Sequence, residues 1–131
     1  MGMPITTDDS GICFAFPNVC LTPTPSGDVP IPYPSIGQLS DAKDTSEDVL
    51  AGGAKVVTTA SIIENTSGDE AGTSGGVKSG TNGKEVTFPQ GSSSVFANSN
   101  AVIRMFDTTE QNSTNAVGTV LGGNPTVLVG G

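Results

Sequence analysis

The chain contains no histidine and no tryptophan, and it has one tyrosine and two cysteines among its 131 residues. Without histidine, the commonest general base and the commonest metal ligand are both missing, so catalytic arrangements built on Ser–His or Cys–His pairs are excluded. Aromatic residues make up 5% of the chain, so large buried rings cannot supply most of the core. The length fits one domain, residues 1–131, with a modest hydrophobic core.

Basic residues are also scarce, because five Lys and Arg stand against thirteen Asp and Glu and give a formal net charge of -8. A surface of this sign repels the phosphates of nucleic acids and of anionic lipids. No apolar run approaches the roughly 20 residues of a membrane-spanning helix, and residues 1–10 lack the basic-then-apolar order of an export signal. We therefore expect no nucleic-acid partner, no stable membrane insertion, synthesis in the cytoplasm, and a flexible N-terminus over residues 1–10.

Glycine and proline are abundant, with 18 and 9 residues, and they alternate with short runs of Val, Ile and Leu. This pattern is typical of short strands joined by tight turns. Between residues 11 and 40, closely spaced prolines exclude a helix and favour extended backbone. Residues 65–83 read NTSGDEAGTSGGVKSGTNG, which is too polar to form a core and predicts a Gly-rich surface loop. The sequence thus predicts an all-β fold of short strands and hairpins with Pro/Gly-rich loops.

Three nine-residue windows align without a gap: VLAGGAKVV from Val49, VFANSNAVI from Val95 and VLGGNPTVL from Val120. Each window has Val at positions one and eight and an apolar residue at positions two and nine. The central pairs are Gly-Gly, Asn-Ser and Gly-Asn, which suit the positive φ angles of a two-residue hairpin turn. We expect three hairpins placed around a common axis in a pseudo-threefold arrangement, the last of them closing the chain over residues 117–129.

The remaining candidates for chemistry are few. Cys13 and Cys20 can be buried structural thiols, a disulfide, or two ligands of a metal site. Two thiolates fall short of the four ligands of a tetrahedral zinc site, and a chain made in the cytoplasm normally stays reduced. We interpret both as structural thiols and expect no metal or other cofactor. Asp69 and Glu70 are interpreted as solvated loop acids; an enzyme built on them is the alternative, but no catalytic residue is predicted.

Two stretches resemble the PAAR-like domains of type VI secretion systems: FPNVCLTPTPSGDVPIPYPSI over residues 16–36 and TSGDEAGTSGG over residues 66–76. Their order and separation are also similar to that family, and the similarity covers roughly residues 11–107. The resemblance implies a small β-rich cone that sits on a trimeric valine–glycine-repeat spike protein, sharpens it for membrane puncture and can link effector proteins to it. PAAR proteins typically hold a metal with several His and a Cys, and since this chain has no His, no metal ligand is carried over.

The repeat and the resemblance together predict a monomer that caps a trimer, with each hairpin meeting one exposed strand edge of the spike. The protein would be made in the cytoplasm, assembled on the spike and ejected with it. The alternative is an exported β adhesin or surface-binding module stabilised by a disulfide between the two cysteines. The residues predicted to bind the spike are Val49, Leu50, Val56, Val57, Val95, Phe96, Val102, Ile103, Val120, Leu121, Val127 and Leu128.

Overall fold

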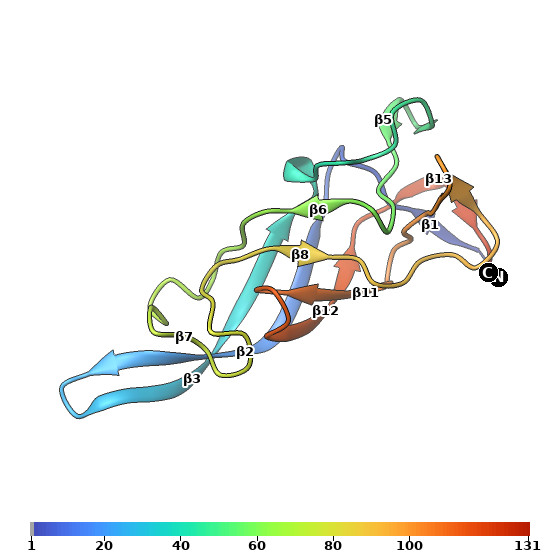
Figure 1. Cartoon of the computed structure of the whole chain (residues 1–131). Helices are drawn as coiled ribbons and strands as arrows, with labels where there is room; N and C mark the ends of the chain where they lie inside the picture. Colours follow the sequence, from blue (N-terminus) through green and yellow to red (C-terminus); the bar gives the residue numbers. More distant parts are fainter. Residues whose placement is uncertain (1) are drawn as a thin grey trace.

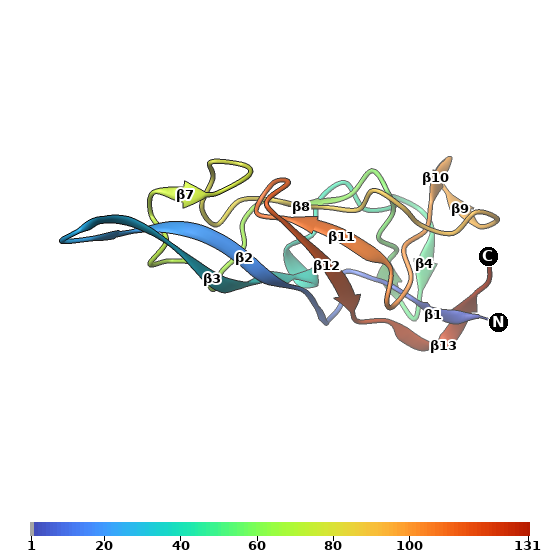
Figure 2. The same ribbon diagram turned by 90° about the horizontal axis from the view of Figure 1, so that it is seen from below.

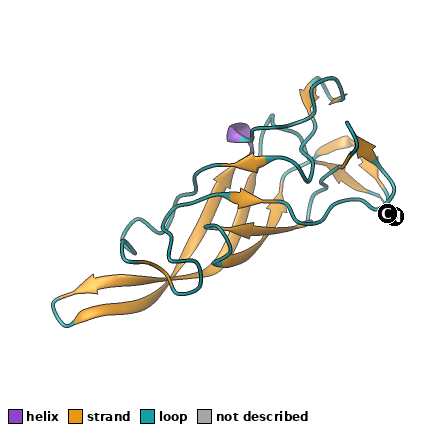
Figure 3. Cartoon of the chain, viewed as in Figure 1, coloured by secondary structure: helices purple, strands orange, loops and turns teal. Residues whose placement is uncertain are grey.

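The computed structural model describes residues 2–131 and is built almost entirely of strands and turns, which confirms the predicted all-β class (Figure 3). One turn of 3-10 helix, η1, covers Leu39–Asp41. No helix in this described part of the chain is long and apolar enough to cross a membrane. The strands are β1 (Met3–Ile5), β2 (Ile12–Thr24), β3 (Gly27–Gln38), β4 (Leu50–Ala51), β5 (Ala54–Lys55), β6 (Ile62–Ile63), β7 (Gly75–Gly76), β8 (Val86–Thr87), β9 (Phe96–Ala97), β10 (Asn100–Ala101), β11 (Thr108–Gln111), β12 (Ala116–Leu121) and β13 (Asn124–Val129).

The largest sheet has the strand order β3-β2-β12-β11-β8-β6, with β7 paired to β2. Its two longest strands, β2 and β3, come from the proline-rich segment and pair with each other from Ile12↔Gln38 to Thr24↔Gly27. The prediction of extended backbone for the proline-rich segment is therefore confirmed. The turn that folds it into a hairpin was not predicted, although Thr24-Pro25-Ser26-Gly27 places Pro and Gly at the positions that a four-residue turn favours, because the many other prolines of the segment obscure this signal. The far end of this hairpin projects from the rest of the molecule (Figure 1).

The core of the molecule consists of two separate hydrophobic clusters. The larger one packs against the inner face of the sheet and comprises Cys13, Leu39, Val57, Ile63, Val86, Phe88, Ile103 and Val120. The smaller one comprises Ile5, Ala51, Val56, Ala97, Val102 and Val129. Its strands, β1, β4, β5, β9, β10 and β13, gather at the end of the molecule opposite the projecting hairpin (Figure 2). Because the side chains are mostly Ala and Val, this second core is small.

Two segments are more ordered than the sequence suggested. The N-terminal segment was predicted to be flexible, but Met3–Ile5 pairs antiparallel with β13 and residues Ile5, Thr6 and Thr7 are buried. The loop over residues 65–83 was predicted to lie on the surface. Many of its residues are exposed, but Gly75 and Gly76 are buried and form a strand paired with β2. Backbone pairing fixes both segments although neither carries a long apolar run.

A pseudo-threefold ring of hairpins as the candidate binding face

Two of the three repeat windows form the predicted hairpins. In the first, β4 pairs with β5 through Leu50↔Lys55, and Gly52 and Gly53 occupy the turn with φ of 59° and 82°. In the second, β9 pairs with β10 through Ala101↔Phe96, and the turn residues at positions 98 and 99 have φ of 50° and 69°. Two successive positive φ angles are the signature of a type I′ turn, whose twist matches that of the flanking strands.

The window that begins at Val120 is not a hairpin, and the predicted hairpin over residues 117–129 is wrong. Strand β12 already pairs with β2 on one side and β11 on the other, so its backbone groups are satisfied without β13. The glycines between the two strands serve close packing instead of a turn. A Cβ at Gly122 would lie 2.9 Å from the Cα of Gly11, and a Cβ at Gly123 would lie 2.7 Å from the Cβ of Pro4.

The third unit of the ring, which we also call a hairpin although no turn joins its two strands, is formed by strands from the two ends of the chain. Strand β13 pairs antiparallel with β1 through Val129↔Met3 and Leu128↔Pro4. In this register Val-Leu-Val at positions 127–129 takes the place of Val-Leu-Ala at 49–51 and of Val-Phe-Ala at 95–97. The repeat therefore exists three times, but its third copy is split between the two ends of the sequence and shifted relative to the predicted window.

A closed cycle of backbone hydrogen bonds joins the three segments that follow the hairpins. The amide of Thr6 donates to the carbonyl of Ile103 at 2.9 Å, the amide of Ile103 donates to the carbonyl of Val57 at 2.9 Å, and the amide of Val57 donates to the carbonyl of Thr6 at 3.0 Å. A second cycle joins the same three segments: the backbone amides of Asp8, Thr59 and Met105 donate to the carbonyls of Lys55, Ala101 and Pro4 respectively, at 2.8 to 3.0 Å. Each segment thus has the same relation to the next, which is a pseudo-threefold axis within one chain.

The hairpin turns continue this cycle. Asn98, in the second turn, donates to the Asp48 carboxylate at 2.8 Å, just before the first hairpin. The carbonyl of Gly131, at the end of the third, accepts the amide of Ser93 at 3.0 Å, just before the second. Gly52, in the first turn, lies against the side chain of Asn124, the first residue of β13. The first two turns and Gly131 therefore each contact either the segment just before another of the three strand pairs or its first residue.

The outer faces of the three hairpins, which we call the ring face, carry equivalent apolar side chains. Leu50, Phe96 and Leu128 are 58%, 58% and 62% exposed. Their inward-facing neighbours Ala51, Ala97 and Val129 are buried in the small core. Three large apolar side chains of nearly equal exposure, at positions related by the hydrogen-bond cycle, are not needed for the core, because they point away from it.

The comparisons with known proteins give one match. The sequence model of the family described as Toxin PAAR-like domain matches residues 11–118, which is most of the chain. The chain belongs to this family. No curated protein and no solved structure matches it. The family match includes β4–β5 and β9–β10 but excludes β1 and β13, so the third hairpin of this PAAR-like domain is visible in the structure alone.

The predicted spike-binding residues of the PAAR-like domain divide into three groups. Leu50, Phe96 and Leu128 lie on the ring face; Val49 and Val95 lie beside them and are also exposed, and Val127 is half-buried. Leu121 is exposed but belongs to β12, outside the hairpins. The rest are buried in the two cores and cannot contact a partner, so their assignment as binding residues is wrong: Val56, Val57, Val102, Ile103 and Val120.

Their burial follows from the ring geometry. Positions eight and nine of the first two windows enter the hydrogen-bonded segments between the two cores, with Val56 and Val102 in the small core and Val57 and Ile103 in the large one. The sequence showed that these positions are apolar in every window. It did not show which of the two apolar pairs faces the solvent, because both pairs fit a hairpin strand.

A buried polar cluster ties the Gly-rich loop to β2. The Asp69 carboxylate accepts hydrogen bonds from the side-chain amide of Asn18 at 2.9 Å and from the backbone amide of Gly83 at 3.0 Å. The side-chain amides of Asn112 and Asn115 donate to the side-chain oxygen Oδ1 of Asn18, at 3.2 and 2.6 Å. Asp69 is 1% exposed, so its interpretation as a solvated loop acid is wrong. Its role is to hold the loop in place.

Both cysteines are free thiols and both are buried, as predicted for structural thiols. Burial raises the pKa of Cys13 to about 12. Burial, followed by the negative charge of Asp69, raises the pKa of Cys20 to about 11. Cys20 lies in the polar cluster, with its Sγ 3.7 Å from Asn18 Oδ1. Thiols with such high pKa values are protonated at neutral pH and are poor nucleophiles.

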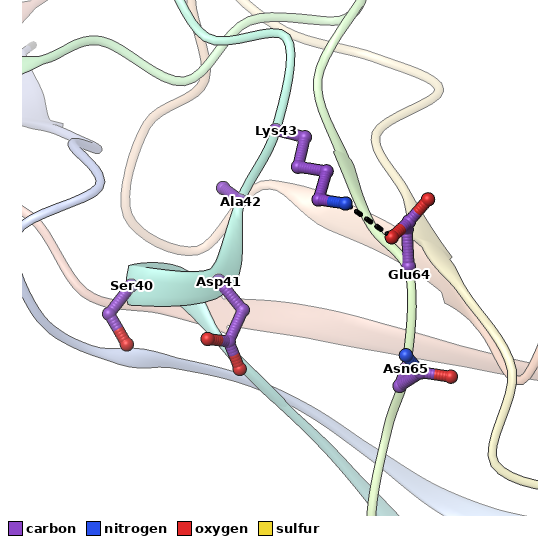
Figure 4. A pocket seen from close by; sticks show the side chains of 6 residues that line it. All are labelled: Ser40, Asp41, Ala42, Lys43, Glu64 and Asn65. Carbon is purple, nitrogen blue, oxygen red and sulfur yellow. Dashed lines mark hydrogen bonds and ion pairs between the residues drawn. The ribbon is translucent and has the colours of Figure 1, made fainter.

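The hollows on the surface are open and polar. One of them is lined by Ser40, Asp41 and Ala42 on one side and by Glu64 and Asn65 on the other (Figure 4). Across it Lys43 Nζ lies 2.6 Å from Glu64 Oε1, with both side chains more than half exposed. An exposed pair of this kind contributes little to stability. No group of three or more Asp, Glu or Cys side chains in residues 2–131 is placed to hold a metal ion.

Proposed function

We propose that this chain is a noncatalytic tip that caps the trimeric spike of a contractile injection machine of the type VI secretion kind and sharpens it for membrane puncture. Membership of the Toxin PAAR-like domain family supports a role on such a spike. The observation that carries the proposal is the ring face, where Leu50, Phe96 and Leu128 are equally exposed on three hairpins joined by a closed hydrogen-bond cycle.

A threefold face suits a trimer for a geometric reason. The three subunits of a symmetric spike present the same surface three times around one axis, and a single asymmetric chain normally matches that surface once. Three related hairpins let one chain make the same apolar contact with each subunit. Exposed apolar side chains that are not needed for the fold are the usual anchors of a protein interface. We therefore expect one tip bound to each trimer.

The shape of the molecule supports the same orientation. The hairpin of β2 and β3 projects at the end opposite the ring (Figure 1). If the ring face rests on the spike, this hairpin points away from it and leads the assembly. The role is then mechanical, and the buried acid Asp69 serves the fold through its hydrogen bonds to Asn18 and Gly83. We further expect synthesis in the cytoplasm, ejection with the spike, and transport of effector proteins bound to the tip or the spike.

The proposal is tested by mixing the purified chain with a trimeric valine–glycine-repeat spike protein and measuring the mass of the complex. The expected complex contains one 13.1 kDa chain for each trimer. A double variant, Leu50→Asp with Leu128→Asp, places two charges on the ring face and should abolish the complex, whereas Val117→Asp, equally exposed but on β12, should not. Three chains on each trimer, or a complex that survives the double variant, would refute the proposal.

A further inference from the structure

The projecting end of the β2–β3 hairpin, residues 22–32, forms a two-stranded ribbon, which we call the distal ribbon, with two edges next to solvent. Exposed strand edges normally present backbone donors and acceptors that recruit another strand. Most residues of the ribbon are exposed. In a protein otherwise made of short paired strands, this ribbon is the obvious place for a second copy of the chain to pair.

The register shows which backbone groups of β3 face outward. The amide of Ile36 donates to the carbonyl of Ser67 and the amide of Ser67 donates to the carbonyl of Ile36, both at 2.9 Å, on the side of β3 away from β2. Strand geometry repeats every two residues, so positions 34, 32 and 30 face the same way. All three are proline. The outer edge of β3 therefore has carbonyl acceptors but no amide donor at these positions.

The opposite edge, formed by β2, follows the same rule. The carbonyls of Val19 and Leu21 accept the amides of Val77 and Ser74, at 3.0 and 3.1 Å, so beyond the bulge between Ala15 and Asn18 the odd positions of β2 face away from β3. The next odd position is Pro23. One outward position of the distal ribbon is not proline, namely Asp28, and its carboxylate accepts a hydrogen bond from Ser74 Oγ at 3.1 Å. A charged residue at an edge also opposes strand pairing.

We propose that these prolines close both edges of the distal ribbon to strand addition, so that the exposed hairpin cannot pair with a second copy of this chain. Strand pairing needs donors and acceptors in alternation, and here a neighbouring strand would meet carbonyls without reciprocal amides. Proline is tolerated at these places because each one occupies a position whose amide would point to solvent. The inference does not depend on the proposed role on a spike.

The test restores the missing donors with Pro30→Thr and Pro32→Thr in one chain. Threonine favours strands, and the two new amides would complete the outer edge of β3. The mass in solution, followed by light scattering over a range of sub-millimolar concentrations, should rise from 13.1 kDa towards twice that value as concentration increases. The matched control is Pro25→Ala, in the turn between the strands, which also removes a proline but opens no edge; it should stay monomeric.

Circular dichroism and the thermal midpoint show whether the double variant keeps its fold. A folded double variant that remains monomeric wherever the unchanged chain does would overturn the inference. If the double variant unfolds, the single variant Pro30→Thr replaces it, with the same expectation of a concentration-dependent gain in mass. Self-association of the Pro25→Ala control to the same extent would also overturn the inference, because loss of stiffness alone would then explain it.

Discussion

Truncation of one ring-face side chain, Leu50→Ala, is expected to weaken binding to a trimeric spike about tenfold. The substitution removes about three carbon atoms, each contributing about 0.8 kcal/mol when buried. Since the side chain is 58% exposed in the free protein, docking can bury about that share, which gives about 1.4 kcal/mol, or about a factor of ten in Kd. Stability should change by less than about 0.5 kcal/mol, because the side chain lies outside both cores.

The measurement is a titration of each variant against an immobilised spike trimer. Leu128→Ala occupies the equivalent position with 62% exposure and should lose the same factor, and the double variant should lose roughly a hundredfold, because separate contacts add in free energy. Val117→Ala, at 65% exposure on β12, is the control and should bind normally. Equal losses from the control, or a loss at one of the two leucines with none at the other, would refute the threefold account.

Three further predictions concern the fold. Ser99→Gly should stabilise the protein by about 1 kcal/mol, because Ser99 adopts a φ of 69° that glycine accepts without strain and its small side chain is exposed; a lower thermal midpoint would contradict this. Asp69→Ala should cost about 3 kcal/mol in chemical denaturation, since it leaves the donors of Asn18 and Gly83 without an acceptor, and an unchanged midpoint would contradict the role of Asp69 in the buried polar cluster. Cys13 and Cys20 should resist thiol reagents at pH 8 until the chain unfolds; rapid labelling of the folded protein would argue against their burial. Their pKa values rise from 9.0 to about 12 and about 11 on folding. The stability of the fold should therefore fall as the pH rises above about 9, where only the unfolded chain loses thiol protons.

The sequence was sufficient for the fold class and for two hairpins, because the signals involved are local. Gly-Gly at positions 52–53 and Asn-Ser at 98–99 specify their own turns by backbone preference. Gly122 and Gly123 look the same in sequence but are glycine for a different reason, close contact with Gly11 and Pro4. A glycine needed for packing and a glycine needed for a turn cannot be told apart without knowing the neighbours in space.

The ring face was predicted in part. The equivalence of Leu50 and Phe96 follows from the alignment of their windows, but the third member is Leu128, not Leu121, because the third hairpin joins β13 to β1 across the two ends of the chain. A gap-free alignment along the sequence cannot find a repeat split in this way. A circular alignment would also need a gap, since four residues in place of two separate Val129 from Met3, and Thr6 stands where the other copies have an apolar residue.

Hydrogen exchange of the chain alone and bound to a spike trimer tests the central claim most directly. The account predicts slower exchange on binding in all three hairpins, β4–β5, β9–β10 and β13–β1, with no change in the distal ribbon of β2 and β3. Protection confined to a single hairpin, or protection of the distal ribbon in place of the ring face, would contradict it.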